Sequence, residues 1–241
     1  ISLFDKENVV ASPEFLSIYL SDRHNGVGGD GVILICPSDK ADAQMRMFNL
    51  DGSEGLMCGN GIRCVAKYLF DNGIAKGQKV GEGRHVLHID TKSGVKECTV
   101  ITKNGLVSKV TVDMGKAELA PEKVPVRLEG EKVVNKPISI GGNVYRITCC
   151  SMGNPHCTVF VPSVDKLDLE DLGPKFEHDP MFPDRVNVEF VEVIDQHTLK
   201  ARIWERGSGE TMACGTGACS SVVAAVENGY FQKGEVVQVH L

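Results

Sequence analysis

The sequence contains no hydrophobic run that approaches the roughly 20 residues needed for a membrane-spanning helix. It also has no excess of positive charge, since 32 acidic residues outnumber 26 Lys and Arg residues and the net charge is −6. This balance argues against nucleic acid or an anionic membrane as the main partner. No signal peptide is visible, and the chain begins at Ile1 rather than at a methionine, so we expect a targeting segment or a first strand to precede it.

The sequence also lacks the pattern of a disulfide-rich secreted domain, although it contains nine cysteines. Their number is odd, their spacing is irregular, and the chain is much longer than such domains usually are. We therefore expect free thiols in a reducing cytoplasm. Five of them stand in strand-like segments and are expected to be small buried hydrophobic residues: Cys36, Cys98, Cys149, Cys150 and Cys157.

The cysteine spacing does not favour a metal site either. A structural zinc site needs a close pair of the C-x₂₋₄-C type. Cys214 and Cys219 enclose four residues, but Cys219 is expected inside a helix, and Cys58 and Cys64 enclose five. We therefore predict no metal.

Two segments, residues 57–64 and 213–219, resemble copies of one sequence motif. Each places a cysteine, Cys58 or Cys214, before a Gly-polar-Gly sequence and then begins an apolar, helix-like run. The first helix is predicted to end at Asn72-Gly73 and the second at Asn228-Gly229. One segment alone could be a glycine-rich turn before a core helix, with a buried thiol. Two matching copies, one in each half of the chain, favour a functional role.

Strand-like segments surround both helices, and residues 115–125, with Pro121 and Pro125, are the predicted boundary between domains 1–115 and 116–241. Both halves therefore repeat one order of strands, helix, Asn-Gly stop and strands. This order predicts an α+β fold with a helix packed on mostly antiparallel strands, and it makes a Rossmann sheet unlikely because strict βαβ alternation is absent. The Asn104-Gly105 pair predicts a hairpin between two of the expected strands, 94–103 and 106–113. The expected strands are 32–36, 43–49, 85–91, 94–103, 106–113, 136–140, 144–151, 158–161, 186–193, 198–204 and 236–241.

The chemistry of a helix start explains why a cysteine would be placed there. The first N–H groups of a helix have no partner within it, and the helix dipole adds partial positive charge, so a helix start favours the binding of a carboxylate. The same field is expected to lower the pKa of a neighbouring thiol and provide thiolate near neutral pH. With an α-amino acid between two such thiols, one takes the α-proton and the other returns a proton to the opposite face. This inversion needs no metal or organic cofactor, and the two thiols titrate as a coupled pair.

Polar residues elsewhere fit an amino-acid substrate. Asn154 and His156 lie in a donor-rich segment that is predicted to be a turn, while Glu205 and Arg206, a few residues before Cys214, could clamp an ammonium and a carboxylate. A structural turn and an ordinary surface ion pair are the alternatives. Asn49 and Asn187 are weaker candidates from the residues alone.

The motifs and their order along the chain resemble those of the diaminopimelate epimerase family, which shares its fold with proline racemase and the phenazine-pathway isomerase group. The resemblance implies two pseudo-twofold-related domains, each a mostly antiparallel sheet curled around a central helix, and often a homodimer. The matching blocks are residues 22–31, 46–54, 57–64, 112–115, 151–156, 182–187 and 205–219.

The resemblance implies interconversion of LL- and meso-diaminopimelate without pyridoxal phosphate, for lysine and peptidoglycan-precursor synthesis. It implies that Cys58 and Cys214 are the acid/base thiols and that His156 supports them. The substrate-binding residues that it implies are Asn49, Gly59, Asn60, Asn154, Asn187, Glu205, Arg206, Gly215 and Thr216.

The chain departs from the family pattern at three points. Residues 1–241 do not include the family's opening strand, with a Gly-Asn-Asp-Phe-like motif and a substrate-binding Asn, or its closing strands. Gly31 stands where some relatives carry a supporting Gln.

Two rival interpretations remain. One is a cofactor-independent racemase of another amino acid, such as histidine or proline; proline racemases place a His where this chain has Asn60. The other is a relative that binds a ligand without catalysis, against which the retention of both Cys58 and Cys214 argues.

Overall fold

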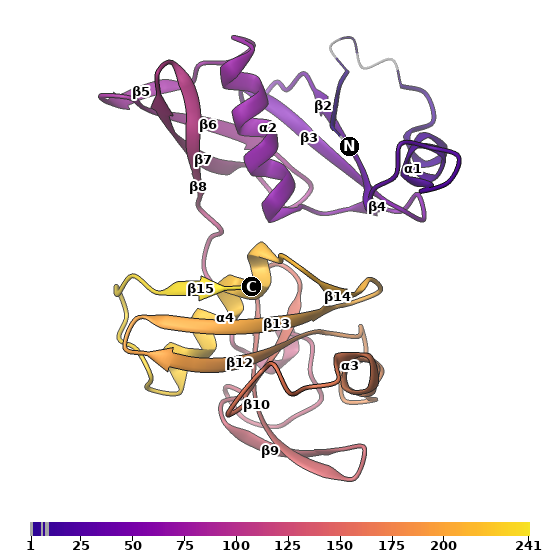
Figure 1. Ribbon diagram of the computed structural model, residues 1–241, viewed down its shortest axis with the longest axis vertical. Helices are drawn as coiled ribbons and strands as arrows, with labels where there is room; N and C mark the ends of the chain where they lie inside the picture. Colours follow the sequence, from indigo (N-terminus) through magenta and orange to yellow (C-terminus); the bar gives the residue numbers. More distant parts are fainter. Residues whose placement is uncertain (1, 6, 8–9) are drawn as a thin grey trace. The chain divides into compact units, whose positions relative to one another are not determined.

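A computed structural model describes residues 2–5, 7 and 10–241 of the chain (Figure 1). The chain divides into two compact units, Ile1–Asp113 and Met114–Leu241, whereas the predicted division stood between residues 115 and 116. Each unit combines one large sheet with two α-helices among its described residues. None of the helices formed by these residues is long and apolar enough to cross a membrane.

The sheet of the first unit has the strand order β1-β2-β3-β6-β7-β8, with β4 paired to β3 and β5 to β6. Its pairs are antiparallel except β1 with β2 and β3 with β6. The strands are β1 (Ser2–Phe4), β2 (Gly31–Cys36), β3 (Ala43–Asn49), β4 (Glu54–Gly55), β5 (Gln78–Gly81), β6 (Arg84–Asp90), β7 (Lys96–Lys103) and β8 (Leu106–Val112).

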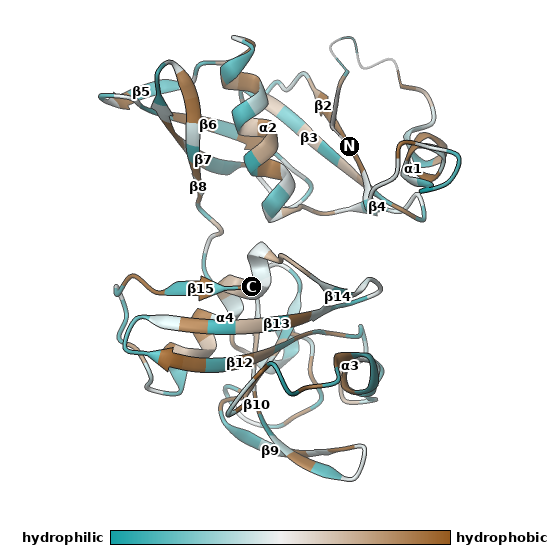
Figure 2. Cartoon of the chain, in the orientation of Figure 1, coloured by the Kyte–Doolittle hydropathy of each residue, from teal (hydrophilic) through white to brown (hydrophobic). Residues whose placement is uncertain are grey.

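Helix α2 (Gly59–Asp71) packs on β6, β7 and β8, and the shorter α1 (Pro13–Ser21) lies against β2 and β3. Hydrophobic and hydrophilic residues alternate along α2, as the brown and teal bands of Figure 2 show. Its apolar side, with Ile62, Val65 and Leu69 fully buried, meets an apolar face of the sheet. The burial of this stripe, rather than helix propensity alone, holds α2 in place.

The sheet of the second unit has the order β14-β13-β12-β11-β10-β9, with β15 paired to β13. Its pairs are antiparallel except β11 with β12 and β13 with β15. The strands are β9 (Lys136–Ile140), β10 (Asn143–Ser151), β11 (Pro155–Phe160), β12 (Asn187–Asp195), β13 (Thr198–Glu205), β14 (Gly209–Thr211) and β15 (Gln238–His240). The α-helices are α3 (Leu169–Glu177) and α4 (Gly215–Glu227).

The interior of the second unit has an apolar part and a separate part that contains buried polar side chains. One large cluster, which includes Phe176 of α3 and Phe190 of β12, is apolar. Helix α4 packs on β10, β11, β12 and β13 instead, through small residues such as Ala224 and Ala225. Toward its N-terminal half this packing encloses polar side chains that are almost fully buried: His156, Thr158, Glu189, Ser220 and Ser221.

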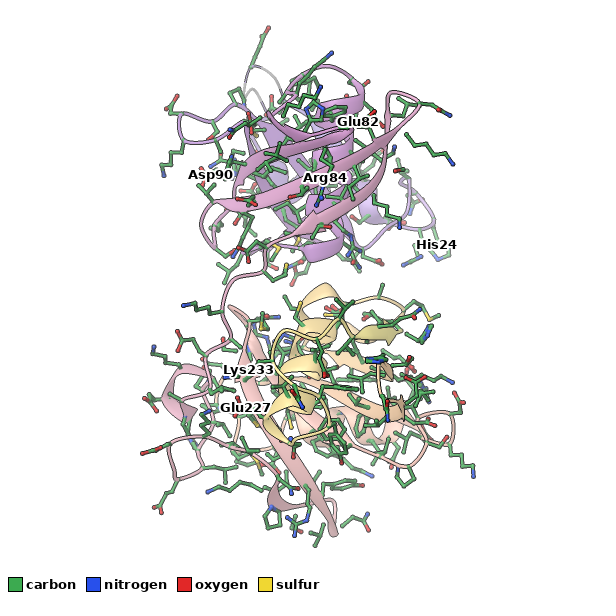
Figure 3. All side chains as sticks on the ribbon, turned by 90° about the vertical axis from the view of Figure 1, so that its left-hand side faces the viewer. His24, Glu82, Arg84, Asp90, Glu227 and Lys233 are labelled. Atoms are coloured by element: carbon green, nitrogen blue, oxygen red, sulfur yellow. The ribbon has the colours of Figure 1, made fainter. Side chains whose placement is uncertain are left out.

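The predicted α+β fold, with a sheet and a central helix in each unit, is confirmed, as is the Asn104-Gly105 hairpin, in which both residues have positive φ. The five cysteines expected to be buried are buried, and all nine, which lie in the described part of the chain, are free thiols. Charged side chains such as His24, Glu82, Arg84 and Lys233 are exposed (Figure 3).

Some local predictions were wrong. Strand β11 begins at Pro155, so His156 lies in a strand and not in a turn, because its backbone pairs with both β10 and β12. Strand β15 is shorter than the predicted 236–241, and Val236 is exposed. Helices α1 and α3 were not predicted. Pro13 at the first turn of α1 and the Asp168 N-cap of α3 are the start signals that were available.

Candidate active site

Cys58 and Cys214 are the N-cap residues of α2 and α4, each a helix of 13 residues. Cys58 has φ −126° and ψ 115°, and its Sγ accepts a hydrogen bond from the Gly61 N–H at 3.3 Å. Cys214 has φ −128° and ψ 112°, and its Sγ accepts from the Gly217 N–H at 3.4 Å. The sulfur atom takes the place that a Ser or Asp oxygen usually has at an N-cap.

The second glycine of each segment serves packing as well as ligand approach. A Cβ on Gly61 would overlap Cδ1 of Ile33, and one on Gly217 would lie 2.6 Å from Cδ1 of Ile203 and 3.1 Å from Oε1 of Glu189. Each helix start therefore lies too close to its own sheet for any larger side chain. This closeness holds the cysteine and the first helical N–H groups in fixed positions.

Cys214 is only 5% exposed, and burial raises the pKa of its thiol to about 12. The Glu205 carboxylate contributes to this rise in pKa, whereas hydrogen bonds from Thr216 and the Gly217 N–H oppose it. The sequence predicted that the helix start would lower the pKa enough to give thiolate near neutral pH. For Cys214 that prediction is wrong in this structure, because the desolvation of the thiolate outweighs the helix-start donors. Cys214 is therefore a neutral thiol, ready to donate a proton.

Three strand ends and one helix start come together near Cys214. Strands β11 and β12 run parallel, with His156 opposite Asn187, and β13 runs antiparallel to β12, with Trp204 opposite Val188. The beginnings of β11 and β12 and the end of β13 therefore share one edge of the sheet. At this edge the Asn154 amide Nδ2 donates to Thr216 Oγ1 of α4 at 3.4 Å.

Asn187 is buried, and its side chain forms hydrogen bonds to the backbone of two neighbouring segments. Its Oδ1 accepts from the Arg206 N–H at 3.0 Å, and its Nδ2 donates to the Pro155 carbonyl at 2.8 Å. The Arg206 guanidinium in turn donates to the Asp184 carbonyl at 2.8 Å. Glu205 accepts a short hydrogen bond from the Thr211 hydroxyl. Glu205 and Arg206 are thus held in place and remain partly exposed.

His156 and Glu189 form a fully buried pair beneath this edge. His156 Nδ1 and Glu189 Oε1 are 2.6 Å apart, and His156 Nε2 lies 2.9 Å from Asn154 Oδ1. Burial raises the pKa of Glu189, and His156 offsets part of that shift. Glu189 was not among the predicted site residues, although a carboxylate within the apolar run of β12 was a signal of a special role.

In the first unit, Asn49 ends β3 and closes a tight turn, in which its Nδ2 donates to Ser53 Oγ at 3.0 Å. Asn60, in the first turn of α2, accepts from the Arg63 guanidinium at 2.6 Å. Besides Asn49, the first unit holds Cys58, Gly59 and Asn60 on one helix start, and the remaining predicted site residues belong to the second unit. Within the described residues, no three His, Cys, Asp or Glu side chains are grouped as a metal site.

These two α+β units give the chain the fold of a structural class that includes a probable proline racemase and a hydroxyproline epimerase. The chain is similar to a crystal structure of a probable proline racemase from Agrobacterium radiobacter, with a TM-score of 0.70 and 17% identity over 93% of this chain and 68% of that one. A hydroxyproline epimerase from Agrobacterium vitis gives a TM-score of 0.67 and 16% identity, over 92% and 67% of the two chains. At such identities the likeness concerns the fold alone.

The chain belongs to the diaminopimelate epimerase family. The family model described as diaminopimelate epimerase matches residues 2–120 and 148–241. A diaminopimelate epimerase of Acetivibrio thermocellus is 48% identical over 97% of this chain and 81% of its own length. One from Geobacillus kaustophilus is 50% identical over 92% of this chain and 74% of its own length.

Proposed function

We propose that this protein interconverts LL- and meso-diaminopimelate without a cofactor. The observation that carries the proposal is the pair of matched helix starts, each with a cysteine at the N-cap and a Gly-polar-Gly sequence after it. Relatives that are named for this reaction and align with nearly the whole chain support the choice of substrate.

In the proposed reaction, one thiolate removes the α-proton and the other thiol protonates the opposite face of the carbon. Proton removal pushes negative charge onto the substrate carboxylate. In this reaction the N–H groups at the helix starts, including those of Gly59, Asn60, Gly215 and Thr216, stabilise that charge. In one direction Cys58 is the base and Cys214 the proton donor, and in the reverse direction the two thiols exchange these roles.

The remaining candidates bind the two amino-acid ends of the substrate. Arg206 pairs with a carboxylate and Glu205 with an ammonium group, while Asn49, Asn154 and Asn187 supply amide groups. His156 supports Cys214 from below the sheet edge. We also propose that the enzyme acts as a homodimer in a reducing cytoplasm, which suits its nine free thiols, and that neither nucleic acid nor a membrane is a partner.

Incubation with LL-diaminopimelate in D₂O tests the proposal. We expect one deuterium at one α-carbon of meso product, detected by mass spectrometry and NMR, and a loss of turnover of at least about 10³-fold in Cys58→Ser and in Cys214→Ser. Proline and histidine serve as control substrates and are expected to remain unchanged. Turnover of either amino acid in place of diaminopimelate, or binding of diaminopimelate without deuterium incorporation, would contradict the proposal.

A further inference from the structure

A chain of hydrogen bonds runs from a buried carboxylate to the Cys214 sulfur. Glu189 Oε1 lies 2.6 Å from His156 Nδ1, and His156 Nε2 lies 2.9 Å from Asn154 Oδ1. Asn154 Nδ2 donates to Thr216 Oγ1 at 3.4 Å, and Thr216 Oγ1 lies 3.4 Å from Cys214 Sγ. All five residues belong to the second unit, on β11, β12, α4 and the adjoining turns.

The direction of each bond follows from the donor capacity of the groups. An amide oxygen cannot donate, so His156 Nε2 must carry the proton that it shares with Asn154 Oδ1. One further proton then lies between His156 Nδ1 and Glu189 Oε1, and the pair is neutral as a whole. Either Glu189 is protonated and donates to Nδ1, or an imidazolium donates to a carboxylate. Both states keep the proton on Nε2.

The orientation of Asn154 decides what the Thr216 hydroxyl can do. With Oδ1 engaged by His156, Nδ2 faces Thr216 and donates to its Oγ1, which leaves the hydroxyl proton free for the Cys214 sulfur. If the amide were turned, Oδ1 would accept that proton, and the Cys214 sulfur would keep only the Gly217 N–H as a donor. The proton on His156 Nε2 therefore favours the orientation of Asn154 that this structure shows.

We propose that Glu189 is a positioning residue that, through His156 and Asn154, aims the Thr216 hydroxyl proton at the Cys214 sulfur. The inference deepens the proposed function, and the catalytic role of this hydrogen bond rests on that function. The Thr216 hydroxyl stabilises the thiolate that forms when Cys214 has given up its proton. The first unit has a different environment at the same place, because α2 packs there on an apolar cluster.

A simple electrostatic role makes the opposite prediction. The groups that act on the Cys214 thiol are the carboxylates of Glu205 and Glu189, which raise its pKa, and the Thr216 hydroxyl and Gly217 N–H, which lower it. If Glu189 acted only by its charge, its removal would lower the Cys214 pKa. If it acts by orientation, replacement by an apolar side chain raises that pKa, whereas Gln, whose amide N–H can donate to His156 Nδ1, preserves it.

The test compares Glu189→Gln and Glu189→Met in the full chain, with folding checked by circular dichroism. Alkylation of Cys214 by iodoacetamide at fixed pH is followed by peptide mass spectrometry and normalised to Cys58 in the same molecule. Below the pKa the rate falls tenfold for each unit by which the pKa rises. We expect the wild-type rate in Glu189→Gln and a rate lower by about tenfold in Glu189→Met. Faster alkylation in both variants, or no change in Glu189→Met, would overturn the proposal.

Two further measurements keep the proposal testable if Glu189→Met does not fold. The ¹⁵N NMR spectrum of labelled histidine in the wild-type protein should show a protonated Nε2 on His156, and an unprotonated Nε2 would refute the relay. Thr216→Val should slow Cys214 alkylation, whereas Thr216→Ser should retain the wild-type rate. These readouts need no substrate, so failure of the relay and failure of the proposed epimerase reaction can be told apart.

Discussion

Cys58 and Cys214 share one local geometry and differ in their surroundings. Their backbone torsions agree within a few degrees, and each sulfur accepts from the N–H three residues along. Cys58 is partly exposed on a helix that packs on an apolar cluster, whereas Cys214 is buried, with Thr216, Asn154 and the His156–Glu189 pair beyond it. The same local geometry therefore stands in two different environments, one partly exposed and one buried among polar side chains.

The charge on Glu205 is expected to control the acidity of Cys214. A carboxylate near a thiol disfavours the thiolate and raises its pKa, so Glu205→Gln should lower the pKa of Cys214. Iodoacetamide at fixed pH should then alkylate Cys214 severalfold faster than in the wild type. Glu210→Gln is the matched control, because Glu210 is paired with Arg202 and should leave the rate unchanged. Equal rates in all three proteins would contradict the prediction.

The remaining cysteines should divide into one accessible thiol and several inert ones. Cys64 is exposed, whereas burial raises the pKa of Cys98 and Cys150 to about 12. Cys98 is 0% and Cys150 1% exposed, so a reagent cannot reach either sulfur atom in the folded protein. We expect native protein to be alkylated at Cys64, with Cys98 and Cys150 modified only after unfolding, as peptide mapping would show. Rapid labelling of Cys98 or Cys150 in folded protein would argue against their burial.

Gly173 in the middle of α3 is expected to be essential for stability. A Cβ there would overlap Cδ2 and Cγ of the Trp204 ring, whose Nε1 donates to Glu177 Oε2 at 2.7 Å. Ala is normally favoured over Gly in a helix by about 1 kcal/mol, but this overlap forces the ring or the helix to move. Gly173→Ala should therefore lower the free energy of unfolding by about 1–3 kcal/mol.

Denaturant unfolding, followed by the fluorescence of Trp204, the single tryptophan, measures this change. The control is Gly81→Ala, where the nearest atoms are 3.8 Å from the new Cβ, with an expected change within about 0.5 kcal/mol. A shift of equal size in both variants would show that Trp204 is not the cause. The displacement should also reach Arg206, because Glu177 accepts from the Gly207 N–H next to it.

Regular patterns allowed most of the fold to be predicted. The repeat of apolar residues along α2 and the Asn104-Gly105 turn are local signals, and they held. Helix α3 was missed because its length and its internal Pro174 weaken the pattern, and its Gly173 is explained only by Trp204, far along the chain. The position of His156 was misjudged since a strand start between two partners leaves little trace in the local sequence.

The sequence by itself determined where the two helices begin and end, because the N-cap cysteine and its glycines act locally at the start and the Asn-Gly pair acts locally at the end. Only the tertiary structure decided the protonation of Cys214, since its pKa depends on burial and on Glu205 and Glu189, which lie on other strands. It also decided that Asn154, His156 and Glu189 form one hydrogen-bonded chain, because the pairing of β11 with β12 brings them together. Desolvation and hydrogen-bond direction depend on which residues pack together, and the sequence alone does not show which residues do so.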